Sequence, residues 1–149
     1  MMLVFAVLVG ATLVLRGIGA LGIAPLERWS ACLRGGLFVM FLLTASAHWG
    51  KRRPDLIRMV PQIFPRPDLM VTITGVLELL GAVGLLIPAT ARVAAVCLAL
   101  LLIALFPANV SAARQKLTIG GTPATALALR APLQVVFITA LLLAGFGRF

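Results

Sequence analysis

Charged side chains are scarce in this 149-residue sequence: only 11% of its residues are Asp, Glu, Lys or Arg, whereas 62% are hydrophobic. Soluble domains average about a quarter charged and about half apolar residues. Disordered chains combine low hydrophobicity with high charge. The composition therefore excludes both classes. The length suits a single domain, so we predict an all-α, polytopic transmembrane helix bundle over residues 1–149.

Acidic residues, histidine and cysteine are also few, and this limits the chemistry available. The chain has four acidic residues, one histidine and two cysteines. Cys32 and Cys97 lack the CxxC spacing of thioredoxin-like pairs and zinc sites, and a haem held by two histidines needs a second one. The sequence has no nucleophile triad and no phosphate-binding loop. We predict no metal site and no catalytic residue, and favour a non-enzymatic protein.

The few charges are mostly positive. Lys and Arg number 13 against four Asp and Glu, which gives a formal net charge of +9. In membrane proteins, basic loops beside apolar spans set the orientation of the chain. The basic residues are not interleaved with stacking aromatic residues, so we predict no nucleic-acid binding.

Long apolar segments occur five times, each close to the roughly 20 residues that a helix needs to cross a bilayer. The predicted spans are about 2–24, 31–50, 69–88, 92–112 and 131–147. Trp29 and Trp49 flank the second span, about 30 Å apart in a helix, which fits tryptophan at both interfaces. Loop 51–68 is predicted to be an interfacial connector with a short helix between Pro54 and Pro61. Its alternative role is a lid or a contact with anionic lipid.

Basic residues are distributed unequally between the two sides that five crossings define. The side of the N-terminus carries Lys51, Arg52, Arg53, Arg58, Arg66, Arg114, Lys116 and Arg130. The other side carries Arg28, Arg34, Arg92 and Arg148. Because the cytoplasmic side is usually the more basic, we predict a cytoplasmic N-terminus and an external C-terminus.

Glu78 lies in the middle of the third predicted span. An ionisable group there costs about 2.5–3.5 kcal/mol on insertion scales. Its helical neighbours, including Thr74 and Gly75, are small, so this face should turn toward another helix. Depth along the spans makes Arg16 and Arg34 its candidate partners. We therefore predict an intramembrane polar network of Glu78, Arg34, Arg16 and Thr74, which either fixes helix packing or serves as a substrate or proton site.

A second polar group is predicted at the cytoplasmic side. Pro107 interrupts the hydrogen-bond ladder of the fourth span, and Asn109 follows it at once. His48 should lie at a similar depth, at the end of the second span. We predict a polar cluster or ligand site of His48, Asn109, Pro107 and the loop residue Arg58. Its alternatives are a purely structural hydrogen-bonded group and a group that donates a proton to a bound ligand.

Four segments, in this order, resemble the DoxX family of small bacterial membrane proteins. They are LRGGLFVMFLLTASAHW, RMVPQIFPRPD, ITGVLELLGAVGLLIP and ALFPANV. The residues that carry the resemblance are Arg34, His48, Pro61, Gly75, Glu78, Pro107, Ala108 and Asn109. The resemblance implies a four-helix core, to which residues 2–24 add one N-terminal helix, and a location in the bacterial inner membrane.

Three functions are considered: the resemblance implies the first two, and Glu78 inside the membrane suggests the third. The first is a non-catalytic subunit or assembly partner of a membrane redox or oxidative-stress complex, in contact with the lipid bilayer and with a membrane-protein partner or further copies of itself. The second is the quinone-binding subunit of an oxidoreductase of the thiosulfate:quinone type, in which His48 or Asn109 binds the quinone and Glu78 carries protons. The third is a small proton-coupled transporter, less favoured because no inverted repeat is evident.

Overall fold

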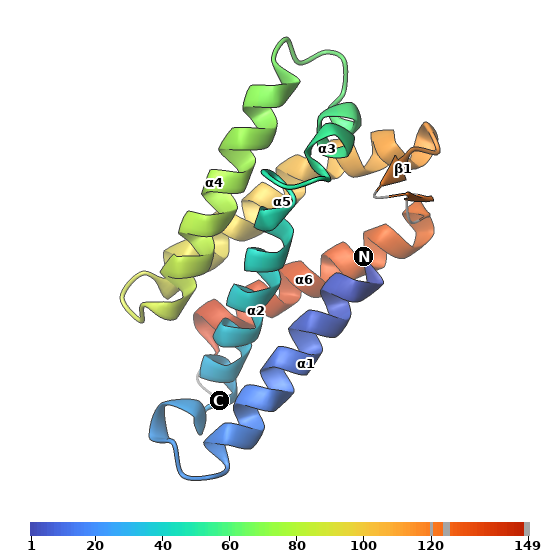
Figure 1. Ribbon diagram of the computed structural model, residues 1–149. Helices are drawn as coiled ribbons and strands as arrows, with labels where there is room; N and C mark the ends of the chain where they lie inside the picture. Colours follow the sequence, from blue (N-terminus) through green and yellow to red (C-terminus); the bar gives the residue numbers. More distant parts are fainter. Residues whose placement is uncertain (120, 124–125, 148–149) are drawn as a thin grey trace.

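Five long helices make up most of the computed structural model, which describes residues 1–119, 121–123 and 126–147 (Figure 1). They are α1 (Met2–Gly19), α2 (Trp29–Ser46), α4 (Pro67–Leu86), α5 (Ala91–Arg114) and α6 (Leu127–Phe146). Each is long and apolar enough to cross a membrane. The prediction of an all-α, polytopic helix bundle is confirmed.

Four of these helices form a closed bundle. Helix α2 packs on α4, α4 on α5, α5 on α6, and α6 on α2, while α1 packs along α2. Side chains such as Leu37, Phe41, Leu85, Leu98 and Leu141 are fully buried between them. This arrangement matches the predicted four-helix core with one additional N-terminal helix.

The helix ends differ from the predicted spans by several residues. Helix α1 ends at Gly19 rather than near residue 24, because the chain turns at Gly22 (φ +93°) into a short 3-10 helix, η1 (Ala24–Leu26). A Cβ atom at Gly19 would lie 2.0 Å from the Leu26 carbonyl oxygen, so this turn requires glycine. Helix α2 ends at Ser46, and α6 begins at Leu127. Apolar runs mark membrane depth, whereas helix ends depend on turns and caps.

The connector between α2 and α4 contains the short helix predicted there, α3 (Arg53–Met59), with proline in its first turn. Arg53 fixes this helix, because its guanidinium donates to the His48 carbonyl oxygen (2.7 Å) and to Thr72 Oγ1 (2.9 Å). One small antiparallel pair, β1 (Thr118–Ile119) with β2 (Thr122–Pro123), follows α5. It was not predicted, since two-residue strands leave no hydropathy pattern.

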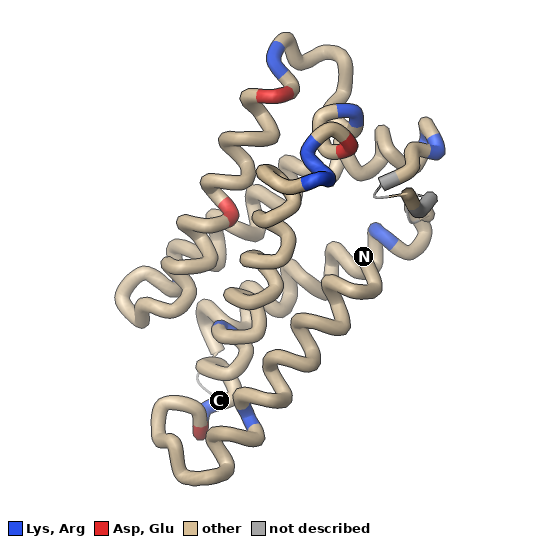
Figure 2. Tube along the Cα trace, in the orientation of Figure 1, with Lys and Arg blue, Asp and Glu red and all other residues tan. Residues whose placement is uncertain are grey.

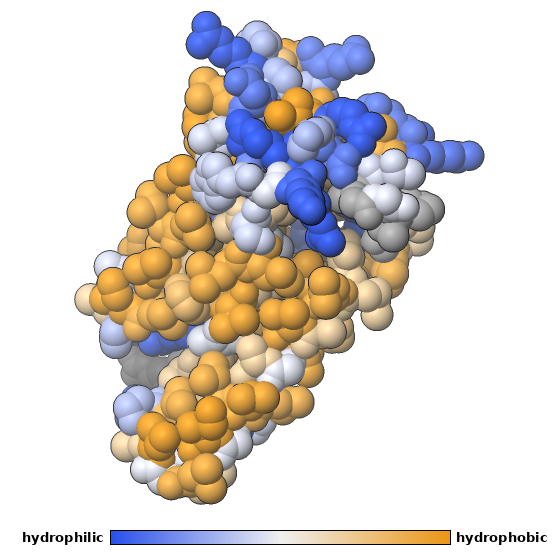
Figure 3. All heavy atoms as spheres, in the orientation of Figure 1, coloured by the Kyte–Doolittle hydropathy of each residue, from blue (hydrophilic) through white to orange (hydrophobic). Residues whose placement is uncertain are grey.

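Charge is concentrated at one end of the bundle. Figure 2 shows that Lys and Arg gather where α1 begins, around α3 and next to the β pair. Figure 3 shows this hydrophilic end above a body whose visible surface is mainly hydrophobic. Helix α6 ends at the opposite end from the start of α1, as five crossings require (Figure 1).

Candidate functional site

Glu78 lies inside the bundle, with only 5% of its surface exposed. Its helix α4 packs against α2. From α2, Thr44 donates its hydroxyl hydrogen to Glu78 Oε2 across 2.8 Å. Among the described residues, neither Arg16 nor Arg34 forms an ion pair with this carboxyl group. The interhelical partner of Glu78 is therefore Thr44, a residue outside the predicted network.

The other members of the predicted network have separate partners. Arg34 Nε donates to the Ala144 carbonyl oxygen (2.8 Å), which joins α2 to α6. The Arg16 guanidinium lies 5.3 Å from the centre of the Trp29 ring, a cation–π contact. Thr74 Oγ1 bonds back to carbonyl oxygens of its own helix. The structure thus does not bring the four residues together, because depth along a span does not determine direction around the bundle axis.

Thr44 contacts one residue of each predicted polar group, Glu78 of the intramembrane network and His48 of the cytoplasmic cluster. Its hydroxyl lies within hydrogen-bond distance of two acceptors, Glu78 Oε2 (2.8 Å) and the Phe41 carbonyl oxygen (3.1 Å), although it has one hydrogen to donate. Its own carbonyl oxygen is 3.3 Å from His48 Nδ1. No sequence signal distinguishes this threonine, since helical threonines commonly bond to a preceding carbonyl.

His48 lies in the turn after α2 and is buried. Its side chain packs on α4 at Gly75, where a Cβ atom would come within 2.7 Å of His48 Cβ and Cγ. Burial lowers the pKa of His48. Hydrogen bonds to the backbone of Thr44 and Ala45 oppose this effect, and the positive charge of Arg53 adds to it. The ring is therefore neutral near pH 7. Since the Thr44 carbonyl oxygen can only accept, Nδ1 carries the hydrogen in this contact and Nε2 is left as an acceptor.

Asn109 belongs to a different contact, between α5 and α6. Its Oδ1 accepts a hydrogen bond of 2.7 Å from Nη1 of Arg130, which is buried in the first turn of α6. Further along this interface, Gln134 Nε2 donates to the Leu102 carbonyl oxygen (3.0 Å). Both Arg130 and Gln134 were missed as interior polar residues. Arg130 was missed because the fifth span was predicted to begin at residue 131, and Gln134 because it is a single polar residue in an apolar span.

The remaining predicted residues of the cytoplasmic cluster also lie apart. Arg58 forms an ion pair with Asp55 within α3 and donates to the Thr118 carbonyl oxygen (3.5 Å). Pro107 lies inside α5, as predicted, and this helix continues to Arg114. In the described structure the hydrogen bonds of His48 and Asn109 thus involve different helices, so the two residues do not define one cluster.

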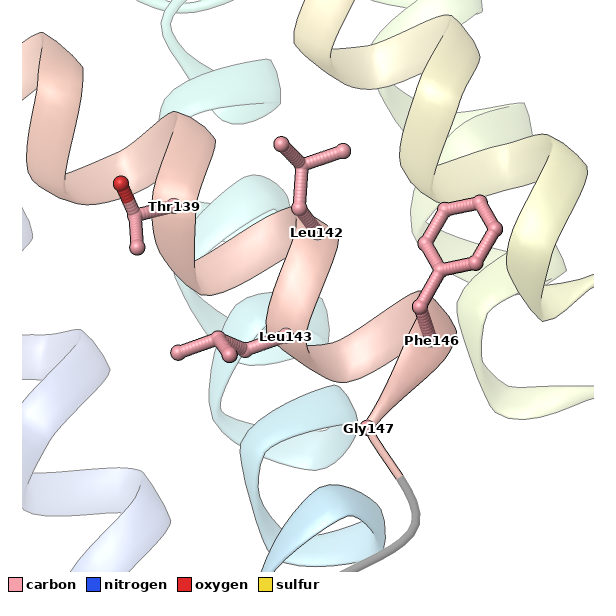
Figure 4. A pocket seen from close by; sticks show the side chains of 5 residues that line it. All are labelled: Thr139, Leu142, Leu143, Phe146 and Gly147. Atoms are coloured by element: carbon pink, nitrogen blue, oxygen red, sulfur yellow. The ribbon is translucent and has the colours of Figure 1, made fainter.

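Two open depressions mark the surface of the described chain. One, of about 490 Å³, is lined by side chains of α6, apolar apart from Thr139, and by Gly147 directly after the helix (Figure 4). The other, of about 250 Å³, lies at the basic end between α1 and α2. Neither is lined by Glu78, His48 or Asn109. The described residues contain no group of three or more His, Cys, Asp or Glu side chains placed to hold a metal ion.

Comparison with known proteins gave one match. The model of a family described as a domain of unknown function (DUF8561) matches residues 37–144. This range holds Thr44, His48, Glu78, Asn109 and Arg130, and so most of the interhelical contacts above. No curated protein and no solved structure matches the chain.

Proposed function

The chain belongs to the DUF8561 family, and from this premise we propose that it is a non-catalytic, DoxX-like subunit or assembly partner of a membrane complex. The proposal rests on which groups the polar side chains in the spans bind. Glu78, Arg34 and Arg130 bind other helices of the same chain, and among the described residues they line neither surface depression. The order of the four sequence motifs and the four-helix core support the DoxX-like character.

Polar contacts join three different pairs of neighbouring helices. Thr44 and Glu78 join α2 to α4, Arg34 and the Ala144 carbonyl join α2 to α6, and Arg130 and Asn109 join α5 to α6. Inside a membrane, such hydrogen bonds hold helices in fixed relative positions. A bundle built in this way supports the role of a rigid membrane subunit in a redox or oxidative-stress complex.

The test is to purify the tagged chain from native membranes in a mild detergent, without delipidation, and to analyse it by native mass spectrometry. We expect a membrane-protein partner of defined stoichiometry. A multi-pass protein of similar size, carrying the same tag and expressed at the same level, is the control for non-specific recovery. Recovery of the chain alone, or of the same proteins with the control, would contradict the role of subunit.

The quinone-binding alternative receives less support from the geometry. A quinone carbonyl needs a hydrogen-bond donor, but the Nδ1 hydrogen of His48 is directed to the Thr44 carbonyl oxygen. Asn109 accepts from Arg130 through Oδ1, and it lines neither of the two surface depressions. A quinone of defined stoichiometry in the same mass spectrum would favour this alternative over the role of subunit. Proton-coupled transport would need Glu78 as coupling group, but Glu78 lines neither of the two surface depressions.

We further propose that the protein resides in the bacterial inner membrane with its N-terminus in the cytoplasm. The unequal distribution of Lys and Arg supports this orientation, because the basic end holds the start of α1 and the α3 connector (Figure 2). The opposite end holds the turn between α4 and α5.

Single-cysteine labelling tests the orientation. In a background in which Cys32 and Cys97 are replaced by alanine, one cysteine is introduced at Gln62, in the connector, or at Ala89, in the α4–α5 turn; both positions are exposed. A membrane-impermeant maleimide is expected to label Ala89→Cys in spheroplasts, and Gln62→Cys only after lysis. The reverse pattern would show the opposite orientation.

A further inference from the structure

The depression at the basic end has two chemically different parts. Its apolar part is formed by Leu3 at the start of α1 and by Leu43 and Ala47 near the end of α2. Its basic part is formed by Lys51 and Arg52, in the turn that leaves α2. The lining therefore changes from hydrocarbon to positive charge along the direction in which α2 leaves the membrane.

A tryptophan indicates the membrane depth at which the lining changes from apolar to basic. Trp49 lies between the apolar and the basic residues in the sequence, and 48% of its surface is exposed. Tryptophan prefers the boundary between hydrocarbon and lipid headgroups. The basic part of the depression thus lies at headgroup level, and the apolar part lies at the level of the acyl chains.

Lys51 and Arg52 differ from the basic residues next to them in having no side-chain partner among the described residues. Arg53 is held by the His48 carbonyl and Thr72, and Arg58 by Asp55. Within the part of the chain that the structure describes, Lys51 and Arg52 are exposed and have no hydrogen bond or ion pair to a side chain. Their charges are available to a ligand.

The surroundings of the depression are also positive. The amino group of Met1, next to Leu3, has a lowered pKa, because it is partly buried and because Arg130 and then Arg52 repel its charge. A site in which cations repel one another is stabilised by an anion. Ammonium and guanidinium groups form charge-assisted hydrogen bonds with phosphate oxygens.

We propose that this depression binds the headgroup phosphate of an anionic phospholipid. Lys51 and Arg52 contact the phosphate, and the upper part of an acyl chain lies against Leu3 and Leu43. The shared chemistry of the ligand is a phosphate anion, and the apolar wall below it selects a lipid over free phosphate. The inference does not depend on the function proposed above.

The test compares lipids and variants by native mass spectrometry of the delipidated full-length chain in detergent. Phosphatidylglycerol is expected to bind about 10-fold more tightly than phosphatidylcholine, because each basic residue near a membrane surface favours anionic lipid. The variant Lys51→Gln/Arg52→Gln is expected to lose this preference. The control Arg66→Gln/Arg114→Gln removes the same charge from exposed residues outside the depression and is expected to keep the preference.

Three results would overturn the proposal. Equal binding of the two lipids to the wild-type chain would do so without any variant. Equal loss of preference in the control variant would show diffuse attraction to the basic end rather than a site. Displacement of phosphatidylglycerol by excess inorganic phosphate would show an anion site without lipid selection. Thermal unfolding of each variant in the same detergent checks that it is folded, which we expect because all four residues are exposed.

Discussion

Replacing Thr44 with valine is expected to destabilise the bundle by about 1–3 kcal/mol, more than replacing Glu78 with leucine. Valine has nearly the shape of threonine, but it cannot donate a hydrogen bond. The Glu78 carboxyl group would then be buried without the one donor that the described structure provides for it. Inside a membrane no bulk water replaces that donor.

Glu78→Leu has a smaller expected effect because it leaves no polar group without a partner. The Thr44 hydroxyl still has the Phe41 carbonyl oxygen at 3.1 Å as an acceptor. Leucine also fills a volume similar to that of glutamate. Replacing both members of a buried polar pair by apolar groups of similar shape is often nearly neutral. The double variant Thr44→Val/Glu78→Leu should therefore be more stable than Thr44→Val alone.

These four proteins form a double-mutant cycle that is measured as unfolding free energy in mixed detergent micelles. The expected order of stability places wild type, Glu78→Leu and the double variant together, and Thr44→Val below them. If Glu78→Leu were as unstable as Thr44→Val, the carboxyl group would stabilise the fold through contacts beyond Thr44. If Glu78→Leu were as stable as wild type but could not replace the wild-type chain in the cell, Glu78 would have a chemical role rather than a structural one.

Gly145→Leu is expected to cost about 3 kcal/mol, at the upper end of overpacking substitutions. At this position α6 lies so close to α5 that a Cβ atom would be 2.7 Å from the Ala95 Cβ. A leucine side chain fits only if the two helices separate. Separation would also lengthen the hydrogen bond from Arg34 to the carbonyl oxygen of Ala144, the preceding residue.

Gly10→Leu in α1 is the matched control. No atom lies within 4 Å of a Cβ atom built at Gly10, so leucine there extends into open space. Both positions are helical, so the gain in helix propensity is similar in the two variants. The same unfolding measurement should leave Gly10→Leu at least as stable as wild type. Equal stability of the two variants would contradict the close α5–α6 packing.

The five spans could be predicted because length and apolar composition are sufficient to identify a membrane-crossing helix. The α3 helix could be predicted because Pro54 and Pro61 limit where it begins and ends. The burial of Glu78 followed from its small helical neighbours, and its 5% exposure agrees with that expectation. These inferences use only the order of residues along one segment.

The partners of the polar residues could not be predicted, because they depend on which helices are neighbours and how each is rotated. Arg16 and Arg34 were placed near the depth of Glu78, yet one lies on Trp29 and the other on α6. Gln134 was overlooked because a hydropathy window includes isolated polar residues in an apolar span, and Arg130 because α6 begins before the predicted span. Thr44 carries no distinguishing pattern at all.

The position of Thr44 between two acceptors has a further physical consequence. Its hydroxyl can donate to a charged Glu78 carboxylate, or it can accept from a neutral carboxylic acid while its own hydrogen turns to the Phe41 carbonyl oxygen. The change between these arrangements is a rotation about a single C–O bond. A unit of charge at the centre of the bundle can thus be gained or lost without displacing a helix.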